Sequence, residues 1–272
     1  MTAAIEKIIS AILAFMIGLV GGAAPAIAPI NQAAIVREAK DETNLGLIIE
    51  PGYKISIFAD KLGSPRDLEF DPNGVVVVSI PSQGKVVALP GGQPKTVVEG
   101  LNYPHGIAFK NNKLYVAETS AVWVFDYDPQ DYKATNKRKI IDLPSGGGHV
   151  TRSILIKDDK IYVSIGSSCN ACVEADSRRA AIWVANLDGS DFKPFATGLR
   201  NSVFMTTDPK TGEIWATDMG QDNLGDDTPF DEVNIIREGN FYGWPYCYDN
   251  QVADQQMNKN GGRFDCSNFF RQ

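Results

Sequence analysis

Short apolar runs separated by turn residues make up most of the chain after Tyr53. The runs are rich in Val, Ile, Tyr and Phe, the separating clusters contain Gly, Pro, Asn and Asp, and helical periodicity is almost absent. This pattern predicts β-strands joined by tight turns. The clearest expected strands are residues 53–58, 74–79, 113–118, 160–165 and 213–218.

Four segments of this region repeat one plan: a polar or basic leading loop, an apolar strand, a turn and a second strand. Their first-strand positions, Leu68, Ile107, Ile154 and Val203, are 39, 47 and 49 residues apart. A period of about 40–50 residues with four strands per unit is typical of a β-propeller blade. We therefore expect an all-β propeller, of which this chain carries about four blades.

The first forty residues follow a different pattern. No charged residue lies between Lys7 and Arg37, and residues 8–30 form one apolar run. The run is long enough to span a bilayer as a helix, and it also has the charged start and small residues of a secretion signal. Both interpretations stay open, and both predict export to the periplasm, the exterior or the outer face of a membrane. The expected division is a signal peptide or membrane anchor at 1–36, a linker at 37–51 and the propeller domain at 52–272.

The charge balance limits the partners of the chain. Lys and Arg total 26 against 33 Asp and Glu, which gives a formal net charge of −7. Such an acidic protein is not expected to bind nucleic acid through a general phosphate-binding surface. The sequence also has no Gly-rich phosphate loop and no GxSxG nucleophile motif.

The leading loops of the repeats are the candidate functional site. In a propeller the first strand of each blade lines the central channel, so the loop before it lies at the channel mouth. These loops hold Arg66, His105, residues 149–152, and Arg200 with Asn201. Polar and basic groups that converge on one funnel indicate a small-molecule site. We expect His105, His149 and Arg200 to face one shared hollow.

Three stretches of the sequence resemble quinoprotein sugar dehydrogenases of the soluble glucose, sorbosone and pyranose dehydrogenase type, which carry pyrroloquinoline quinone (PQQ) on a six-bladed propeller. The stretches are GGGHVTRSILIKDDKIYVSIGSSCN (146–170), GLRNSVFMTTDPKTGEIWATDMGQDN (198–223) and FDEVNIIREGNFYGWPYCY (230–248). The resemblance spans about 52–248. It implies oxidation of a sugar or polyol with PQQ and Ca²⁺, and transfer of the electrons to an external acceptor.

The resemblance also implies a role for each matched residue. His149 lies where the family has its general base, which takes the hydroxyl proton while hydride passes to the quinone. An imidazole with an ordinary pKa near 6.5 suits that role at neutral pH. Arg200 and Asn201 match a pair that contacts the cofactor, and a guanidinium can clamp a carboxylate or polarise a quinone oxygen. His105 and Arg66 are expected to be further cofactor contacts.

A calcium site follows from the same resemblance. Gly220 and Gln221 match two backbone carbonyls that hold a cofactor-bridging Ca²⁺, and Asp222 is a nearby candidate ligand, since a hard cation selects oxygen donors. The chain departs from glucose-oxidising relatives at Gly148, where they have an Asp, at Gln221, where they have a Pro, and at His105, where they have an amide. The sugar therefore stays undetermined.

The number of repeats is smaller than in the family. Four repeats cover about 64–239, and the residues that follow are too few for two further blades. The family takes further basic cofactor ligands from those blades, and an unclosed propeller exposes strand edges. We therefore expect a shortened form of a longer chain, which as written binds PQQ poorly.

The four cysteines allow two interpretations. Two local disulfides, Cys169–Cys172 and Cys247–Cys266, fit an exported protein. The alternative is a four-cysteine zinc site, which normally needs two CxxC pairs, whereas this chain has one.

Two other functions compete with the oxidoreductase. One is a calcium-dependent hydrolase of the lactonase-like propeller type, which would need several acidic and amide ligands where this chain has basic groups. The other is a non-catalytic binding propeller on the cell surface, in which the histidines and arginines form a ligand patch.

Overall fold

The computed structural model describes residues 40–43, 45–259 and 264–268. By its contacts the chain divides into two units, Met1–Ile57 and Phe58–Gln272. In the first unit β1 (Lys40–Asp41) pairs in parallel with β2 (Lys54–Ile55), so the strand expected at 53–58 is shorter than predicted. The expected signal or anchor at 1–36 lies outside the described residues. Within the described ranges, no helix has the length and apolar character needed to cross a membrane.

The second unit consists mainly of four antiparallel sheets that follow one another in sequence. The first sheet comprises β3 (Leu68–Phe70), β4 (Val76–Ile80), β5 (Lys85–Ala88) and β6 (Lys95–Val98). The second comprises β7 (Ile107–Lys110), β8 (Lys113–Glu118), β9 (Ala121–Asp128) and β10 (Lys133–Asp142). The third comprises β11 (Arg152–Lys157), β12 (Lys160–Ile165), β13 (Ala181–Asn186) and β14 (Lys193–Thr197). The fourth comprises β15 (Met205–Thr207), β16 (Ile214–Asp218) and β17 (Glu232–Ile236).

Short elements complete the unit. The strands β18 (Cys247–Tyr248) and β19 (Val252–Ala253) pair as a small hairpin. The 3₁₀ helices are η1 (Pro81–Gln83), η2 (Pro90–Gly92) and η3 (Cys266–Asn268).

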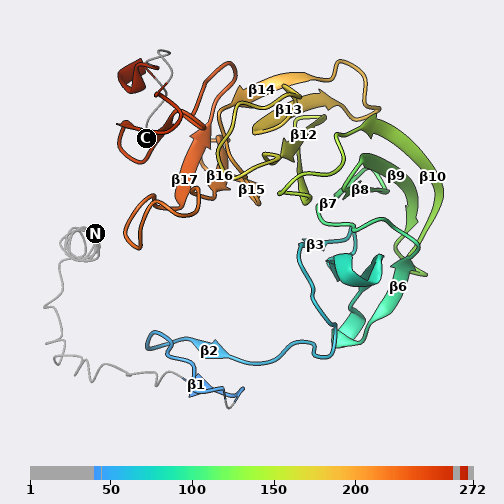
Figure 1. The fold of residues 1–272 in the computed structure, drawn as a ribbon. Helices are drawn as coiled ribbons and strands as arrows, with labels where there is room; N and C mark the ends of the chain where they lie inside the picture. The colour runs from blue at the N-terminus through green and yellow to red at the C-terminus, as the bar shows by residue number, and fades with distance from the viewer. Residues whose placement is uncertain (1–39, 44, 260–263, 269–272) are drawn as a thin grey trace, which may run out of the picture. The chain divides into compact units, whose positions relative to one another are not determined.

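The four sheets are arranged as successive propeller blades. Each first strand contacts the first strand of the next sheet, β3 with β7, β7 with β11, and β11 with β15. Within this unit β3, β7 and β15 lie toward the middle, and β6, β10 and β14 lie at the outer rim (Figure 1). The predicted all-β arrangement of about four blades is confirmed. The fourth sheet has three strands among the described residues, and Val203 precedes its first strand instead of lying in it.

Apolar side chains that point alternately to the two faces of a strand form the core between neighbouring sheets. On β8, Leu114 and Val116 pack toward the first sheet, whereas Tyr115 and Ala117 pack toward the third. Successive residues of a strand point to opposite faces, so one apolar strand serves both interfaces. Burying each large apolar side chain contributes about 1.5–3 kcal/mol, which holds neighbouring sheets together. The outermost strand β10 is mostly exposed and rich in lysine, which suits an edge strand.

The first sheet has an apolar, solvent-exposed face on the side turned away from the second sheet. Leu68 and Phe70 on β3 are 54% and 60% exposed, whereas Ile107 at the start of β7 is fully buried. A groove on this face is also lined by Phe58, Leu62 and Leu89.

Candidate active site

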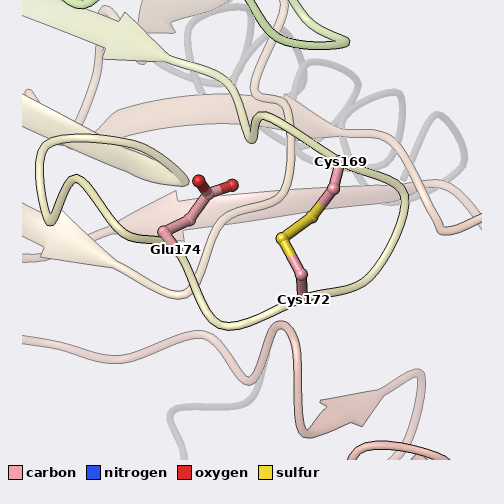
Figure 2. Close-up of side chains that lie close together, drawn as sticks. All are labelled: Cys169, Cys172 and Glu174. Carbon is pink, nitrogen blue, oxygen red and sulfur yellow. A yellow bond between two sulfur atoms is a disulfide. The ribbon is translucent and has the colours of Figure 1, made fainter.

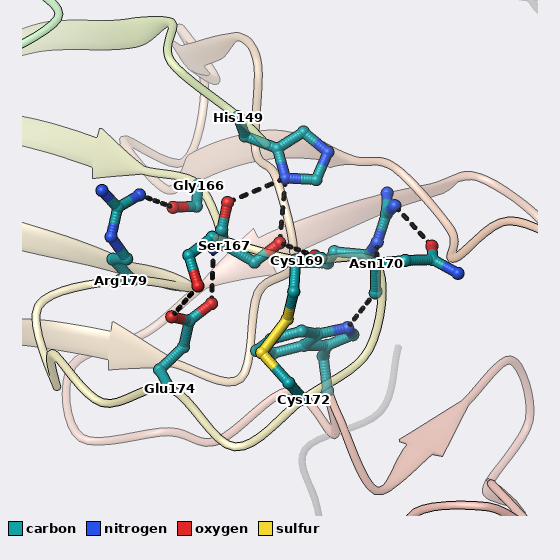
Figure 3. The surroundings of a disulfide bond; sticks show 11 residues. His149, Gly166, Ser167, Cys169, Asn170, Cys172, Glu174 and Arg179 are labelled. Atoms are coloured by element: carbon teal, nitrogen blue, oxygen red, sulfur yellow. Dashed lines mark hydrogen bonds between the residues drawn. A yellow bond between two sulfur atoms is a disulfide. The ribbon is translucent and has the colours of Figure 1, made fainter. Parts of the chain in front are cut away.

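His149 lies in a glycine-rich loop between β10 and β11, and one of its ring nitrogens is anchored. Nδ1 lies 2.9 Å from Ser167 Oγ and 3.1 Å from Ser167 O (Figure 3). Ser167 Oγ donates its proton to Cys169 O at 2.7 Å. Because both oxygens of Ser167 then act as acceptors, Nδ1 carries the proton. In the neutral ring Nε2 has the free lone pair, and no residue in the described part of the chain bonds to it.

The surroundings of His149 keep its ring neutral. Burial lowers the pKa of the half-buried imidazole, and the positive charge of Arg200 lowers it further. Arg152 acts in the same direction, whereas Asp222 and the Ser167 backbone raise the pKa, without reversing the net effect. A neutral imidazole with a bonded Nδ1–H and an open Nε2 has the form required of a general base.

Two buried arginines hold the backbone of this loop. Arg152, the first residue of β11, is fully buried, and Arg179 is 7% exposed. Their guanidinium groups donate to loop carbonyls at 2.7–2.9 Å. The accepting carbonyls are those of Pro144, Ser145, Gly146, His149 and Thr151. The sequence placed Arg152 in the leading loop beside His149, whereas the structure buries it under that loop.

The Arg200 guanidinium is fully engaged, and its side chain is 4% exposed. Nε donates to Asn170 O at 2.9 Å, and Nη2 donates to Asn170 Oδ1 at 2.8 Å and to Asp222 Oδ2 at 3.0 Å. Nη1 donates to Gly220 O at 2.8 Å. Of these partners only Asp222 is largely exposed, at 73% of its side chain.

Asp218, at the end of β16, positions the backbone of the Arg200 loop. Its carboxylate accepts the Arg200 amide at 2.9 Å and the Asn201 amide at 2.7 Å. Burial raises the pKa of Asp218 to about 7, so the two amide bonds do not fully offset the cost of burying its charge.

Gly166, directly after β12, allows Asn201 to approach His149. A Cβ atom on this glycine would lie 2.5 Å from Asn201 Oδ1 and 2.6 Å from His149 Cβ, closer than such contacts allow. The backbone of Ser167 also donates to Arg200 O at 2.8 Å. The structure therefore brings His149, Arg200 and Asn201 together, from the leading loops of the third and fourth blades.

His105 and Arg66 belong to a different neighbourhood. His105 is fully buried, with Nδ1 at 3.5 Å from Ser153 Oγ and its ring centroid 5.5 Å from that of Phe204. Its Nε2 has no hydrogen-bond partner among the described residues. Arg66 is exposed. No hydrogen bond within the described ranges joins these two side chains to His149 or Arg200, and the fully buried His105 does not face an open hollow with them.

The burial of His105 predicts an acid-sensitive fold. Burial lowers its pKa to about 4, with a smaller contribution from the charge of Arg66. Between pH 6.5 and 4 the unfolded chain takes up a proton that the folded chain does not, so stability falls as the pH falls. We expect His105 to account for a loss of about 3 kcal/mol over this range. Urea denaturation of wild type and His105→Gln at pH 7 and pH 4 measures it, and equal losses in both proteins would contradict the prediction.

The predicted calcium ligands lie against Arg200. Gly220 O and Asp222 Oδ2 are hard oxygen donors of the kind that Ca²⁺ selects, and both accept from the Arg200 guanidinium. The Gln221 side chain is buried and donates to Asp254 Oδ2 at 2.5 Å. Asp231 accepts the Gly220 amide at 3.0 Å, which fixes this turn. The donor set fits a hard cation in kind, and the cation that it binds in this structure is the guanidinium.

The two predicted disulfides are confirmed. Cys169 is bonded to Cys172, and Cys247 is bonded to Cys266, so the zinc alternative is wrong because all four sulfurs are paired. Glu174 lies beside the first disulfide (Figure 2). Its carboxylate accepts from Ser168 N and Oγ at 2.6 and 2.7 Å.

Sequence reasoning missed several residues of this site. Ser167, Asn170 and Asp218 all lie inside the stretches that carry the family resemblance, and that position is the only signal that marks them. Arg179 lies in a polar loop and has no sequence signal at all.

Comparisons with known proteins give a consistent result. The profile of a family described as TrAA12-like matches residues 47–271. An uncharacterized protein of Borreliella burgdorferi is 29% identical over 77% of this chain and 59% of its own length. A pyrroloquinoline quinone-dependent sugar dehydrogenase of Hypocrea jecorina is 24% identical over 72% of this chain and 56% of its own length. The chain therefore spans a little over half the length of these two relatives.

Solved structures share the fold. The Trichoderma reesei enzyme of carbohydrate-active family AA12, in its iodide structure, superposes with a TM-score of 0.69 at 22% identity, covering 79% of this chain and 68% of that one. The holo form of the pyranose dehydrogenase PQQ domain from Coprinopsis cinerea superposes with a TM-score of 0.65 at 23% identity, covering 75% of this chain and 61% of that one.

Proposed function

The chain belongs to the TrAA12-like family, and from that membership we propose that it is the PQQ-binding part of an oxidoreductase that oxidises a sugar or polyol. The resemblance to quinoprotein sugar dehydrogenases that three stretches of the sequence indicate agrees with this family. The observation that carries the proposal is the open Nε2 of His149, held beside Arg200 on a ring whose Nδ1 is anchored.

In the proposed mechanism the residues of this chain bind, orient and take a proton. When bound, PQQ supplies a quinone that accepts hydride, and Ca²⁺ supplies a positive charge. His149 Nε2 takes the proton of the substrate hydroxyl, while Ser167 holds the ring in place. Arg200 and Asn201 would lie beside the anionic cofactor, and because the Arg200 N–H groups are already bonded within the chain, Arg200 would act through its positive charge.

The remaining predicted ligands have supporting roles. Gly220, Gln221 and Asp222 would hold Ca²⁺ through oxygen atoms, for which Gly220 O and Asp222 Oδ2 would have to release the Arg200 guanidinium. His105 and Arg66 remain candidates for further cofactor contacts, although His105 is buried in this structure. The sugar and the external electron acceptor stay unassigned.

The acidic residues near the site argue against a lactonase-like hydrolase. Asp218 binds two backbone amides, Asp222 binds Arg200, and Asp231 binds the Gly220 amide. Asp218 and Asp231 are thus committed to backbone amides, and basic groups lie where a hydrolytic metal would need several acidic ligands.

We also propose that the protein is exported. The two disulfides support this, because such bonds persist in oxidising compartments. Fractionation of cells that express the chain tests export, and recovery of all the protein in the cytoplasm would contradict it. Retention in the membrane fraction would distinguish an anchor at residues 8–30 from a cleaved signal.

Cofactor-dependent turnover is the direct test of the proposed function. Full-length protein loaded with PQQ and Ca²⁺ is expected to reduce an artificial electron acceptor when supplied with aldoses or polyols. Omission of PQQ, or addition of a calcium chelator, should abolish the reduction. Failure of every sugar, polyol and aldehyde under these conditions, together with absence of PQQ binding by calorimetry, would refute the proposal.

A further inference from the structure

Asn170 makes five hydrogen bonds around the candidate site. Its backbone O accepts from Arg200 Nε at 2.9 Å and its Oδ1 accepts from Arg200 Nη2 at 2.8 Å. The same Oδ1 accepts the Asp222 amide at 2.7 Å, and Nδ2 donates to Asp222 O at 2.9 Å. Trp244 Nε1 donates to Asn170 O at 3.3 Å. One residue thus binds the Nε and Nη2 donors on one edge of the guanidinium and also the segment that carries Asp222.

Asn170 lies in a four-residue ring closed by the Cys169–Cys172 disulfide (Figure 3). The ring is fixed on both sides. Before it, Ser167 Oγ donates to Cys169 O, and after it, the Glu174 carboxylate binds Ser168. Because Ser167 is also the partner of His149 Nδ1, the ring is connected to both functional side chains.

Resting on the proposed function, we propose that Asn170, held by the Cys169–Cys172 disulfide, is the positioning residue that fixes the Arg200 guanidinium beside His149, where its positive charge would attract the anionic cofactor. To accept both hydrogen bonds from Arg200, the backbone O and Oδ1 of Asn170 must point toward the guanidinium at the same time. A loop without the disulfide would have to lose its conformational freedom to reach this state. The disulfide keeps the loop in the competent form before the ligand arrives, which strengthens binding.

The Cys169–Cys172 disulfide is expected to contribute more to the geometry of the site than to the stability of the fold. It closes a ring of only four residues, whereas Cys247–Cys266 closes a loop with a sequence separation of 19. A cross-link constrains the unfolded chain more as the closed loop becomes longer. The second disulfide is therefore the demanding control, because its removal is expected to cost more global stability.

The test compares three variants with the wild type: Asn170→Ala, Cys169→Ser/Cys172→Ser, and the control Cys247→Ser/Cys266→Ser. The first readout uses the protein without cofactor. The Arg200 Nε–H signal, assigned by its loss in Arg200→Lys, should be protected from hydrogen exchange in the wild type and in the control. It should lose that protection in the other two variants. Asn170→Asp, which keeps the Oδ1 acceptor, should restore part of it.

The second readout is the affinity for PQQ, measured by calorimetry in the presence of Ca²⁺. Loss of an outer-shell residue that orients a metal ligand typically costs 10–100-fold in affinity or activity, and by analogy we expect a loss of about that size for Asn170→Ala and for Cys169→Ser/Cys172→Ser. The control should stay within about threefold of the wild type, a margin chosen well below that range.

The two readouts separate this proposal from the proposed function. Unchanged Arg200 protection in both ring variants would overturn the positioning role, whatever the chain binds. If the wild type does not bind PQQ but the ring variants lose Arg200 protection, the positioning of Arg200 stands and the proposed cofactor is wrong. Equal losses in the control variant would show that the disulfide ring acts only through general stability, which would also overturn the proposal.

Discussion

Replacing His149 with alanine is expected to lower kcat for sugar oxidation about 10²–10⁴-fold, the contribution typical of a positioned general base. The affinity for PQQ should change little, because the contacts assigned to the cofactor come from Arg200 and Asn201. The measurement is kcat with saturating sugar and calorimetric binding of PQQ to the same preparations. His149→Gln, which keeps a side chain of similar size without a base, should lose as much activity as the alanine variant.

The pH dependence provides a second check on His149. Because burial and Arg200 lower the pKa of this imidazole, the ring stays neutral at pH values where an ordinary histidine is protonated. The acid limb of kcat/KM is therefore expected below the ordinary histidine pKa of about 6.5. If PQQ affinity and turnover fall in parallel in both His149 variants, the residue has a structural role and the assignment is wrong.

Replacing Arg152 with lysine is expected to lower the free energy of unfolding by about 3–6 kcal/mol. The guanidinium makes three charge-assisted bonds to buried carbonyls, and an ammonium on a flexible stem can reproduce about one of them. Each lost bond of this kind costs about 1.5–3 kcal/mol. In the lysine variant the positive charge would stay buried with fewer hydrogen-bond partners. Burial and the neighbouring Arg179 already lower the pKa of Arg152 to about 10. Urea denaturation at pH 7 measures the loss.

A surface arginine is the matched control for Arg152. The side chain of Arg138 is 58% exposed and lies 3.7 Å from Asp126, a surface ion pair of small expected value. Arg138→Lys should therefore change the stability by no more than about 0.5 kcal/mol. A loss below about 1 kcal/mol for Arg152→Lys would show that the three carbonyl bonds contribute far less than their geometry implies.

The blade pattern of the fold is visible in the sequence because it depends on local periodicity. The first strands at Leu68, Ile107 and Ile154 lie in β3, β7 and β11, where the repeat predicts them. Alternating apolar residues bury both faces of a strand such as β8, and this preference needs no knowledge of distant partners. The prediction for Val203 failed by two residues, since a strand boundary depends on hydrogen bonds to its neighbour.

The grouping of the candidate site residues was less predictable. The repeat placed Arg66, His105, His149 and Arg200 at equivalent positions, and the structure joins only the last two to a common set of contacts. His105 is fully buried, and Ser153 of the third blade and Phe204 of the fourth lie beside it. Equivalent positions in a repeat share a backbone location, whereas exposure depends on the size of the neighbouring side chains.

The amino-acid sequence alone indicated the repeating strands, the leading loops that carry the basic residues, the family, and two local disulfides as one of two interpretations of the cysteines. These features follow from periodicity and short-range spacing. Only the tertiary structure decided that Asn170 binds Arg200 from 30 residues away, that Ser167 selects the proton position of His149 from 18 residues away, and that Arg152 is buried. Those contacts arise where loops of neighbouring blades meet, and a pattern along one chain does not encode the distance between two such loops.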